Sequence, residues 1–281
     1  MRSLHAVTRV VTAVLAVGVL GALAGSVAPA RAPEETERAP AGFVALRDLE
    51  PEIQQDIRYA GDHNFVGEPI DGYLAAECLL AEETARALGR ARRALERDGL
   101  GLRVFDCYRP QRAVDHFLRW AEEPEGRADG GDGQDGGDGQ DGAAERRAEF
   151  HPRVPRDRLF EEGYLAEHSG HSRGGTVDLT LVDAEGRPVD MGTDFDFFDP
   201  ASHPDSTEPN RAQRRARERL RSALAEHGFA PIDTEWWHFG HEDEPYPDRR
   251  FDFPVDRSVL RDGEGDGRDG DDEGKGEGDD G

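Results

Sequence analysis

The segment SGHSRGGTVDLTL (Ser169–Leu181) carries two overlapping patterns that predict different proteins. Residues 170–174 match G-x-S-x-G, the turn that presents the nucleophile of many serine hydrolases. The same segment places His171 seven residues before Asp178, a pair that could form half of a metal site. The flanking sequence has to decide between the two.

The neighbouring residues favour the metal site. A nucleophile turn follows a buried apolar strand and leads directly into a helix. Here the preceding FEEGYLAEH (160–168) is polar and charged, and the following Thr176–Val182 is rich in β-branched residues, as in a strand. In that strand Val177, Leu179 and Leu181 share one face, which puts Asp178 on the other.

A metal site needs further ligands. On a straight strand, the odd spacing would separate His171 from Asp178, but the Arg173-Gly174-Gly175 turn or bulge could bring them together. Catalytic zinc takes three protein ligands, and His238 in EWWHF (235–239) could be the third. Glu235 would then lie near enough to act as a base, and Arg109 could stabilise an oxyanion.

The remaining periodicity predicts one α+β domain over residues 43–260. We expect helices over 81–98, from Pro110 onward, and over 211–227, where Ala212, Ala216, Leu220 and Leu224 form the inner stripe. We expect strands over 101–106 and 176–182, with a return strand in FAPIDTEWWHFG (229–240).

Charge is unevenly distributed along the 281 residues, whose net charge is −25. Over half of the excess lies in two segments with few apolar residues, at 125–143 (net −5) and 262–281 (net −8). We predict that the glycine-rich insert 125–143, with its GGDGQD tandem, and the tail 261–281 are disordered. No basic stripe supports nucleic acid binding.

The N-terminus has the pattern of a signal peptide over residues 1–32, followed by a linker over 33–42. An uncleaved anchor is the alternative; no other segment could span a bilayer. We therefore predict a secreted or cell-envelope protein. In an oxidising compartment, Cys78 and Cys107 suggest one disulfide, with two buried thiols as the alternative.

The sequence resembles the zinc D-alanyl-D-alanine dipeptidases of the VanX type. The resemblance covers nearly all of 43–260 and rests on these blocks: IRYAGDHNFVGEPIDGY (57–73), VFDCYRPQRAVDHF (104–117), SGHSRGGTVDLTL (169–181), MGTDFDFFD (191–199), EWWHF (235–239) and DEPYPDRRFDFPV (243–255). The insert and the tail depart from the compact family pattern.

The resemblance implies one zinc ion per chain, held by His171, Asp178 and His238, with Glu235 as catalytic base and Arg109 as stabiliser of the transition state. It places Asp196 and Tyr73 near the substrate ammonium and Ser169 in the substrate pocket. The implied fold is a central antiparallel sheet with flanking helices, shared with hedgehog domains and other D-Ala-cleaving peptidases. Exported relatives would also suit a Cys78–Cys107 bridge.

We therefore expect zinc-dependent hydrolysis of D-Ala-D-Ala, in turnover of wall-derived dipeptides rather than in cytoplasmic resistance. A D,D-carboxypeptidase acting on longer wall peptides would use the same metal set, and a non-catalytic zinc-bearing binding module is the alternative from another class. A serine hydrolase using Ser172 is the remaining possibility. The oligomeric state is open.

Overall fold

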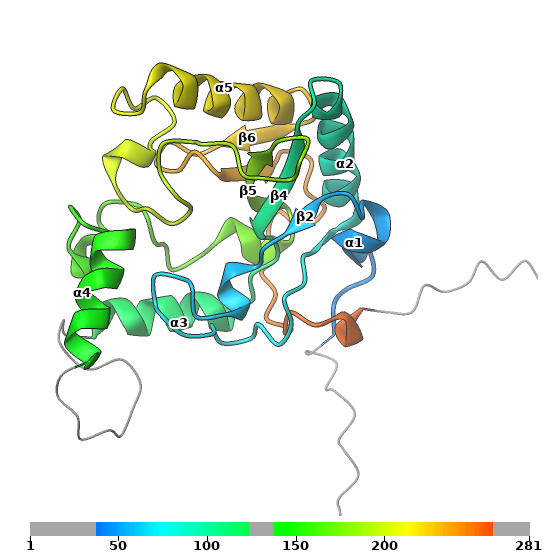
Figure 1. The fold of residues 1–281 in the computed structure, drawn as a ribbon. Helices are drawn as coiled ribbons and strands as arrows, with labels where there is room; N and C mark the ends of the chain where they lie inside the picture. The colour runs from blue at the N-terminus through cyan, green and yellow to red at the C-terminus, as the bar shows by residue number, and fades with distance from the viewer. Residues whose placement is uncertain (1–37, 124–137, 261–281) are drawn as a thin grey trace, which may run out of the picture. The chain divides into compact units, whose positions relative to one another are not determined.

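The computed structural model describes residues 38–123 and 138–260. The predicted signal peptide, the first part of the linker, residue 124, residues 125–137 of the insert and the acidic tail lie outside the described residues. The described part is an α+β domain, which confirms the predicted fold class (Figure 1). None of its helices is long and apolar enough to cross a membrane.

A five-stranded sheet lies at the centre of the fold, with its strands in the order β2-β4-β5-β7-β6. Its strands are β2 (Gln54–Gln55), β4 (Gly101–Asp106), β5 (Thr176–Val182), β7 (His238–His241) and β6 (Phe229–Pro231). The pairs β4–β5, β5–β7 and β7–β6 are antiparallel, and a separate antiparallel pair joins β1 (Phe43–Ala45) to β3 (Leu79–Ala81).

The sheet is mixed rather than wholly antiparallel, because β2 pairs parallel to β4. A parallel partner cannot be reached by a tight hairpin and needs a crossover connection. The 45 residues from 56 to 100 supply it and include helix α2 (Glu82–Glu96). The prediction of an antiparallel sheet missed this edge strand, whose two residues are too few to show a pattern.

Two long helices cover one face of the sheet. Figure 1 shows α2 and α5 (Arg211–Ala225) beside the strands, and both helices contact the sheet and each other. Their inner residues pack on the alternate side chains of β4 and β5, and each is at most 1% exposed: Leu88, Ala91, Leu95, Leu102, Val104, Val177, Leu179, Leu181, Leu220, Ala223 and Leu224. Burial of these side chains, at about 25 cal/mol per Å² of apolar surface, holds this layer together.

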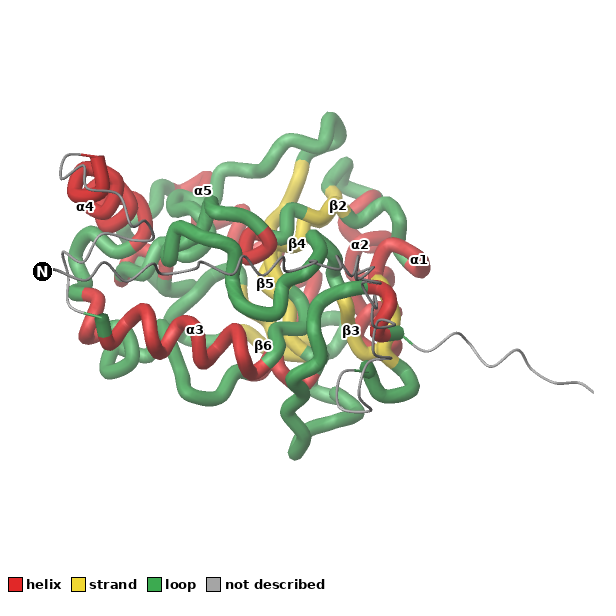
Figure 2. The backbone as a smooth tube through the Cα atoms, turned by 90° about the horizontal axis from the view of Figure 1, so that it is seen from below, coloured by secondary structure: helices red, strands yellow, loops and turns green. Residues whose placement is uncertain are grey.

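The other face of the sheet is covered mainly by loops and by α3 (Gln111–Glu122). Figure 2, seen from the side on which α3 lies, shows loops crossing in front of the strands. An aromatic cluster fills this layer, and the ring centroids of its contacting pairs lie 4.8–6.1 Å apart: Tyr59, Phe65, Phe117, Trp120 and Phe198. The face therefore carries long, irregular segments, and these supply most of the side chains around the metal-ligand candidates.

Three predicted boundaries need correction. Residues 229–240 form a hairpin of β6 and β7 instead of one strand, because Pro231 and the polar residues after it end β6. Residues 138–143 of the predicted disordered insert belong to helix α4 (Asp138–Phe150). The later part of this helix is the helix-favouring sequence AAERRAEF (143–150). Ala39, in the predicted linker, is fully buried, and its N–H donates to the carbonyl of Val259.

Candidate active site

A short turn brings His171 over the sheet. The 3₁₀ helix η4 (Gly170–Arg173) begins at Ser169, whose hydroxyl accepts a bond of 3.2 Å from the His171 N–H. It ends at Gly174, whose φ of +78° lies in the left-handed region that favours glycine. A Cβ at Gly174 would also collide with the Phe43 ring. This turn confirms the predicted reversal before β5.

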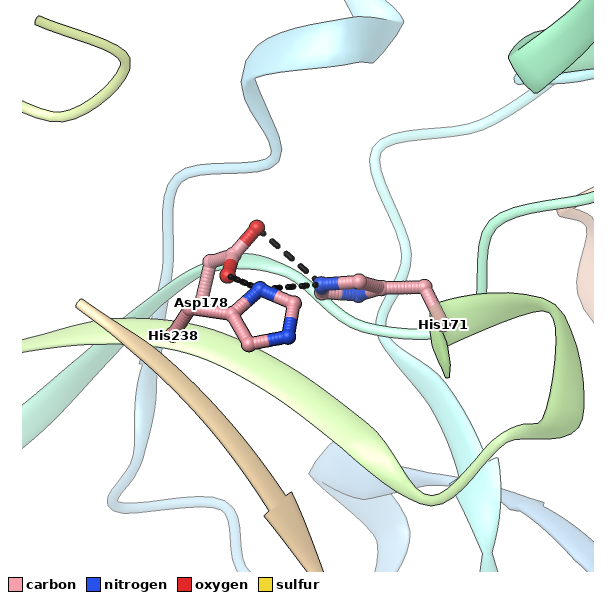
Figure 3. A group of neighbouring side chains, drawn as sticks. All are labelled: His171, Asp178 and His238. Atoms are coloured by element: carbon pink, nitrogen blue, oxygen red, sulfur yellow. Dashed lines mark hydrogen bonds and ion pairs between the residues drawn. The ribbon is translucent and has the colours of Figure 1, made fainter. Parts of the chain in front are cut away.

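The turn places His171 beside Asp178 and His238, whose candidate ligand atoms all lie within 4.8 Å of one another (Figure 3). His171 Nε2 lies 3.3 Å from Asp178 Oδ2, and His238 Nδ1 lies 3.1 Å from Asp178 Oδ1. The two imidazole nitrogens are 3.3 Å apart. Asp178 and His238 are paired residues of β5 and β7, so the sheet register fixes their separation.

The donor set fits a metal ion. His171 Nδ1 lies 2.6 Å from the Cys107 carbonyl, which can only accept a bond, so Nδ1 carries the proton and Nε2 presents its lone pair. Asp178 Oδ1 is buried and has no hydrogen-bond partner of acceptable geometry in the described structure, despite the nearby His238. Buried carboxylate oxygens are normally satisfied. Two imidazoles and one carboxylate also form a ligand set that zinc commonly uses.

The site carries excess negative charge. Asp106, Asp178, Asp196 and Glu235 are all buried, and Arg109 places one guanidinium among them. Burial raises the pKa of Glu235 and that of Asp196, and the charge of Asp178 raises both further. For Asp178, burial acts in the same upward direction, but the two imidazoles outweigh it and lower its pKa. A divalent cation at the three ligands would offset this repulsion.

Glu235 lies in the loop between β6 and β7, three residues before His238. Its Oε2 is 3.6 Å from His238 Nδ1, and its side chain is 9% exposed. Glu235 therefore lies next to the ligand set, at the place that the sequence predicted. The β6–β7 hairpin makes this possible, because Glu235 lies in the loop that leads into His238 at the start of β7.

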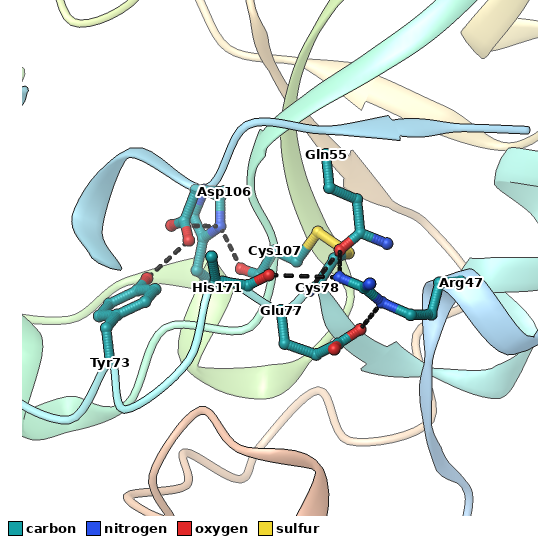
Figure 4. The surroundings of a disulfide bond; sticks show 9 residues. Arg47, Gln55, Tyr73, Glu77, Cys78, Asp106, Cys107 and His171 are labelled. Carbon is teal, nitrogen blue, oxygen red and sulfur yellow. Dashed lines mark hydrogen bonds and ion pairs between the residues drawn. A yellow bond between two sulfur atoms is a disulfide. The ribbon is translucent and has the colours of Figure 1, made fainter. Parts of the chain in front are cut away.

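Arg109 is held by a carboxylate that the sequence reasoning did not single out. Its Nε lies 2.9 Å from Asp106 Oδ2, and its Nη2 is 3.4 Å from Asp178. Asp106 also accepts a 2.6 Å bond from the Tyr73 hydroxyl and lies 3.3 Å from His171 Nδ1 (Figure 4). Asp106 precedes Cys107 in the matched block 104–117, so its place at the end of a strand was the available signal.

Cys107 lies in a disulfide with Cys78, and their Cα atoms are 5.3 Å apart. The predicted bridge is confirmed, and the alternative of two free thiols is wrong. It joins the segment after Tyr73 to the segment that carries Arg109. Figure 4 shows the bridge next to the Cys107 carbonyl that binds His171.

Asp196 is buried in the segment between β5 and the 3₁₀ helix η5 (Pro200–Ser202). Its φ of +59° is in the left-handed region, an unusual conformation for a residue other than glycine. The hydroxyl of Tyr59 donates to Asp196 over 2.9 Å. Tyr73 thus contacts Asp106 rather than Asp196, although the two tyrosine rings are only 5.6 Å apart. Tyr59 was missed because both tyrosines lie in the same matched block.

The serine of G-x-S-x-G has no catalytic surroundings. The hydroxyl of Ser172 is buried and has no hydrogen-bond partner among the described residues. A serine nucleophile needs a base within hydrogen-bond reach. The imidazole of the preceding residue instead belongs to the metal-ligand group.

Comparison with known families gives the same answer as the geometry. A family model described as D-ala-D-ala dipeptidase matches residues 39–256. The chain belongs to this dipeptidase family. Membership identifies it as a metal-dependent peptidase, as the resemblance implied.

Individual relatives carry the same description. A D-alanyl-D-alanine dipeptidase of Streptomyces coelicolor is 42% identical over 214 residues, which cover 76% of this chain and 98% of the relative. One from Enterococcus faecium is 36% identical over 215 residues, with the same two coverages. One from Escherichia coli K12 is 29% identical over 197 residues, covering 70% of this chain and 83% of the relative.

Proposed function

We propose that this protein hydrolyses D-Ala-D-Ala to two molecules of D-alanine with one bound zinc ion. The observation that carries the proposal is the convergence of His171, Asp178 and His238, with Glu235 beside them. Relatives named as D-alanyl-D-alanine dipeptidases match 76% of the chain, which supports it. We also propose that the sheet from β4 to β6 is the antiparallel core shared with hedgehog-like and D-Ala-cleaving zinc proteins.

The three ligands would hold zinc through His171 Nε2, His238 Nδ1 and the Asp178 carboxylate. Zinc, when bound, supplies a Lewis acid that polarises the scissile carbonyl and acidifies water. Hydrolysis forms one C–O bond to water and breaks the C–N bond of the dipeptide. Glu235 accepts the proton that water loses and delivers it to the nitrogen of the leaving D-alanine.

Arg109 is suited to stabilise the negative charge that develops on the carbonyl oxygen. Asp106 fixes its guanidinium, and the rings of Tyr59 and Phe117 lie 5.0 and 5.2 Å from the guanidinium carbon. A preorganised cation in a water-poor site acts more strongly than one in solvent.

Asp196 would bind the substrate's free ammonium. Tyr59, which bonds to Asp196, and Tyr73 would lie near that ammonium, and Ser169 would lie at the pocket wall. Buried anions need a compensating cation, and the substrate ammonium would supply it. A carboxyl group at a fixed distance from the metal ligands can bind an ammonium only when one residue separates it from the scissile bond. Asp196 therefore favours dipeptides over N-blocked wall peptides.

We further propose that the protein works outside the cytoplasm on wall-derived dipeptides. The proposal rests on the signal-like N-terminus, and the Cys78–Cys107 bridge supports it, because disulfides persist in oxidising compartments. Fractionation of cells that express the tagged chain tests the location: a protein found only in the cytoplasm with an intact N-terminus would contradict it.

The activity is tested by release of free D-alanine from D-Ala-D-Ala, with and without a chelator. Glu235→Gln should lower kcat by about 10²–10⁴-fold while the zinc content per chain stays near that of the unaltered protein. Near-normal turnover in this variant would remove Glu235 as the base. Equal cleavage of N-acetyl-D-Ala-D-Ala would favour the carboxypeptidase, and bound zinc without any turnover would favour a binding module.

A further inference from the structure

Helix α5 buries a charged residue that its apolar stripe does not predict. Arg217 is 4% exposed and lies in the same helix as the buried Leu220 and Leu224. Within the described residues, no carboxylate lies in ion-pair range of its guanidinium. Burial lowers the pKa of Arg217 to about 10 against the opposing effect of the Asp190 charge, which lies beyond ion-pair range, so Arg217 remains a cation at neutral pH. A buried cation without an ionic partner requires some other compensation.

The compensation comes from one loop, residues 191–203, which leaves the sheet and carries Asp196. Arg217 donates to the carbonyls of Met191 over 2.7 Å and Ala201 over 2.9 Å, and to that of His203 over 3.1 Å. It also donates to the hydroxyl of Thr193 over 3.2 Å. These partners lie at both ends of the loop, so the guanidinium closes the loop at its base.

The loop needs such a closure because Asp196 has an unfavourable backbone conformation. A non-glycine residue at φ +59° persists only where the surrounding structure holds it. The bond from Tyr59 holds the carboxylate end of Asp196. The bonds from Arg217 hold the chain on either side of it.

The loop that Arg217 closes also holds the segment that carries Glu235. The Thr193 hydroxyl accepts a 2.8 Å bond from Trp236 Nε1, and the Trp236 N–H donates to the Ser202 carbonyl over 3.0 Å. The Thr193 and Ser202 hydroxyls are 2.9 Å apart. The guanidinium carbon of Arg217 lies 5.8 Å from the Trp236 ring centroid. The loop 191–203 and the segment that carries Glu235 therefore meet at the Thr193 hydroxyl, to which Arg217 also donates.

We propose that Arg217 is a positioning residue that sets the separation between Asp196 and Glu235, and so determines the preference for a free α-ammonium. The inference rests on the proposed dipeptidase function. Arginine suits the position because its rigid, planar group directs five N–H donors to separate acceptors. Lysine would offer three donors from one point, and methionine none. Neither Asp196 nor Glu235 bonds to Arg217, so it acts through the backbone.

The test compares Arg217→Met and Arg217→Lys with Arg221→Met, a control on the same helix. Arg221 is 48% exposed and bonds only to the neighbouring Glu218 among the described residues. Steady-state kinetics would give kcat and KM for D-Ala-D-Ala, and kcat/KM for propionyl-D-alanine, which lacks the amino group. Zinc per chain would be measured for every variant.

For Arg217→Met we expect at least a tenfold rise in KM for D-Ala-D-Ala, a smaller fall in kcat, and unchanged zinc content. Its preference for D-Ala-D-Ala over propionyl-D-alanine should fall at least tenfold. Arg217→Lys should recover part of this preference, and Arg221→Met should match the unaltered protein. Thr193→Val, which keeps the shape but removes the shared hydroxyl, should move the preference in the same direction if Arg217→Met does not fold.

An unchanged preference in both Arg217→Met and Thr193→Val would overturn the proposal. So would an equal loss on both substrates, since that would indicate a general structural role. If the unaltered protein and Arg221→Met do not cleave D-Ala-D-Ala at all, the dipeptidase function itself fails and the inference falls with it.

Discussion

The Cys78–Cys107 bridge should make a large contribution to stability, and replacing both cysteines by alanine tests this. The bridge spans 29 residues in sequence and both sulfurs are buried. In the chain-entropy account, closing a loop of about 30 residues removes about 12 cal/mol/K from the unfolded chain, or about 3.5 kcal/mol at 25 °C. With m of about 2–3 kcal/mol/M in urea, the midpoint should fall by about 1.2–1.8 M.

The assay is urea unfolding of the double variant Cys78→Ala/Cys107→Ala against the unaltered protein, with the same zinc concentration in both. Unfolding the unaltered protein with excess tris(2-carboxyethyl)phosphine, a reductant without thiol groups, serves as the control. Its unfolded chain is then also unconstrained, so its midpoint should approach that of the variant. The slope m should rise, because the unfolded chain without the bridge is less compact and exposes more surface.

The bridge should also affect metal binding, because the Cys107 carbonyl accepts the bond that orients His171. The variant keeps this backbone carbonyl but frees the segment that carries it, so zinc affinity should fall by less than the roughly 10–100-fold that complete loss of an outer partner typically costs. Competition with a chromogenic chelator would measure this. A double variant with an unchanged urea midpoint and unchanged zinc affinity would refute the reasoning on both counts.

Two further predictions concern single side chains. Gly174→Ala should destabilise the fold by more than about 1 kcal/mol and lower the zinc content, since φ is +78° there and the new Cβ meets Phe43; thermal unfolding and metal analysis would measure both. Burial opposes ionisation of Asp199, but its bonds from Arg153 and the Ala201 N–H prevail and lower its pKa. Asp199 therefore stabilises the fold above its unfolded pKa of about 4, and this contribution is lost as pH falls through its lower folded value. The stability gap between the unaltered protein and Arg153→Ala, about 1 kcal/mol for so exposed an arginine, should be present at pH 7 and shrink below pH 4; an equal gap at both pH values would contradict the assignment.

The sequence by itself determined the parts of the site that depend on local backbone geometry. The Arg173-Gly174-Gly175 reversal, the strand after it and the position of Glu235 three residues before His238 could all be predicted, because short motifs fix local conformation and relative direction. The family resemblance then supplied the role of each residue. The α+β class followed from helix and strand periodicity, which depends on neighbouring residues alone.

Only the tertiary structure decided the contacts between distant segments. The bond between Tyr59 and Asp196 joins residues 137 apart, and nothing local distinguishes Tyr59 from Tyr73 as its donor. The parallel pairing of β2 with β4 and the burial of Arg217 were hidden for the same reason. A charged residue or a two-residue strand gives no periodic signal, and its place is set by the carbonyls and carboxylates that folding brings to it.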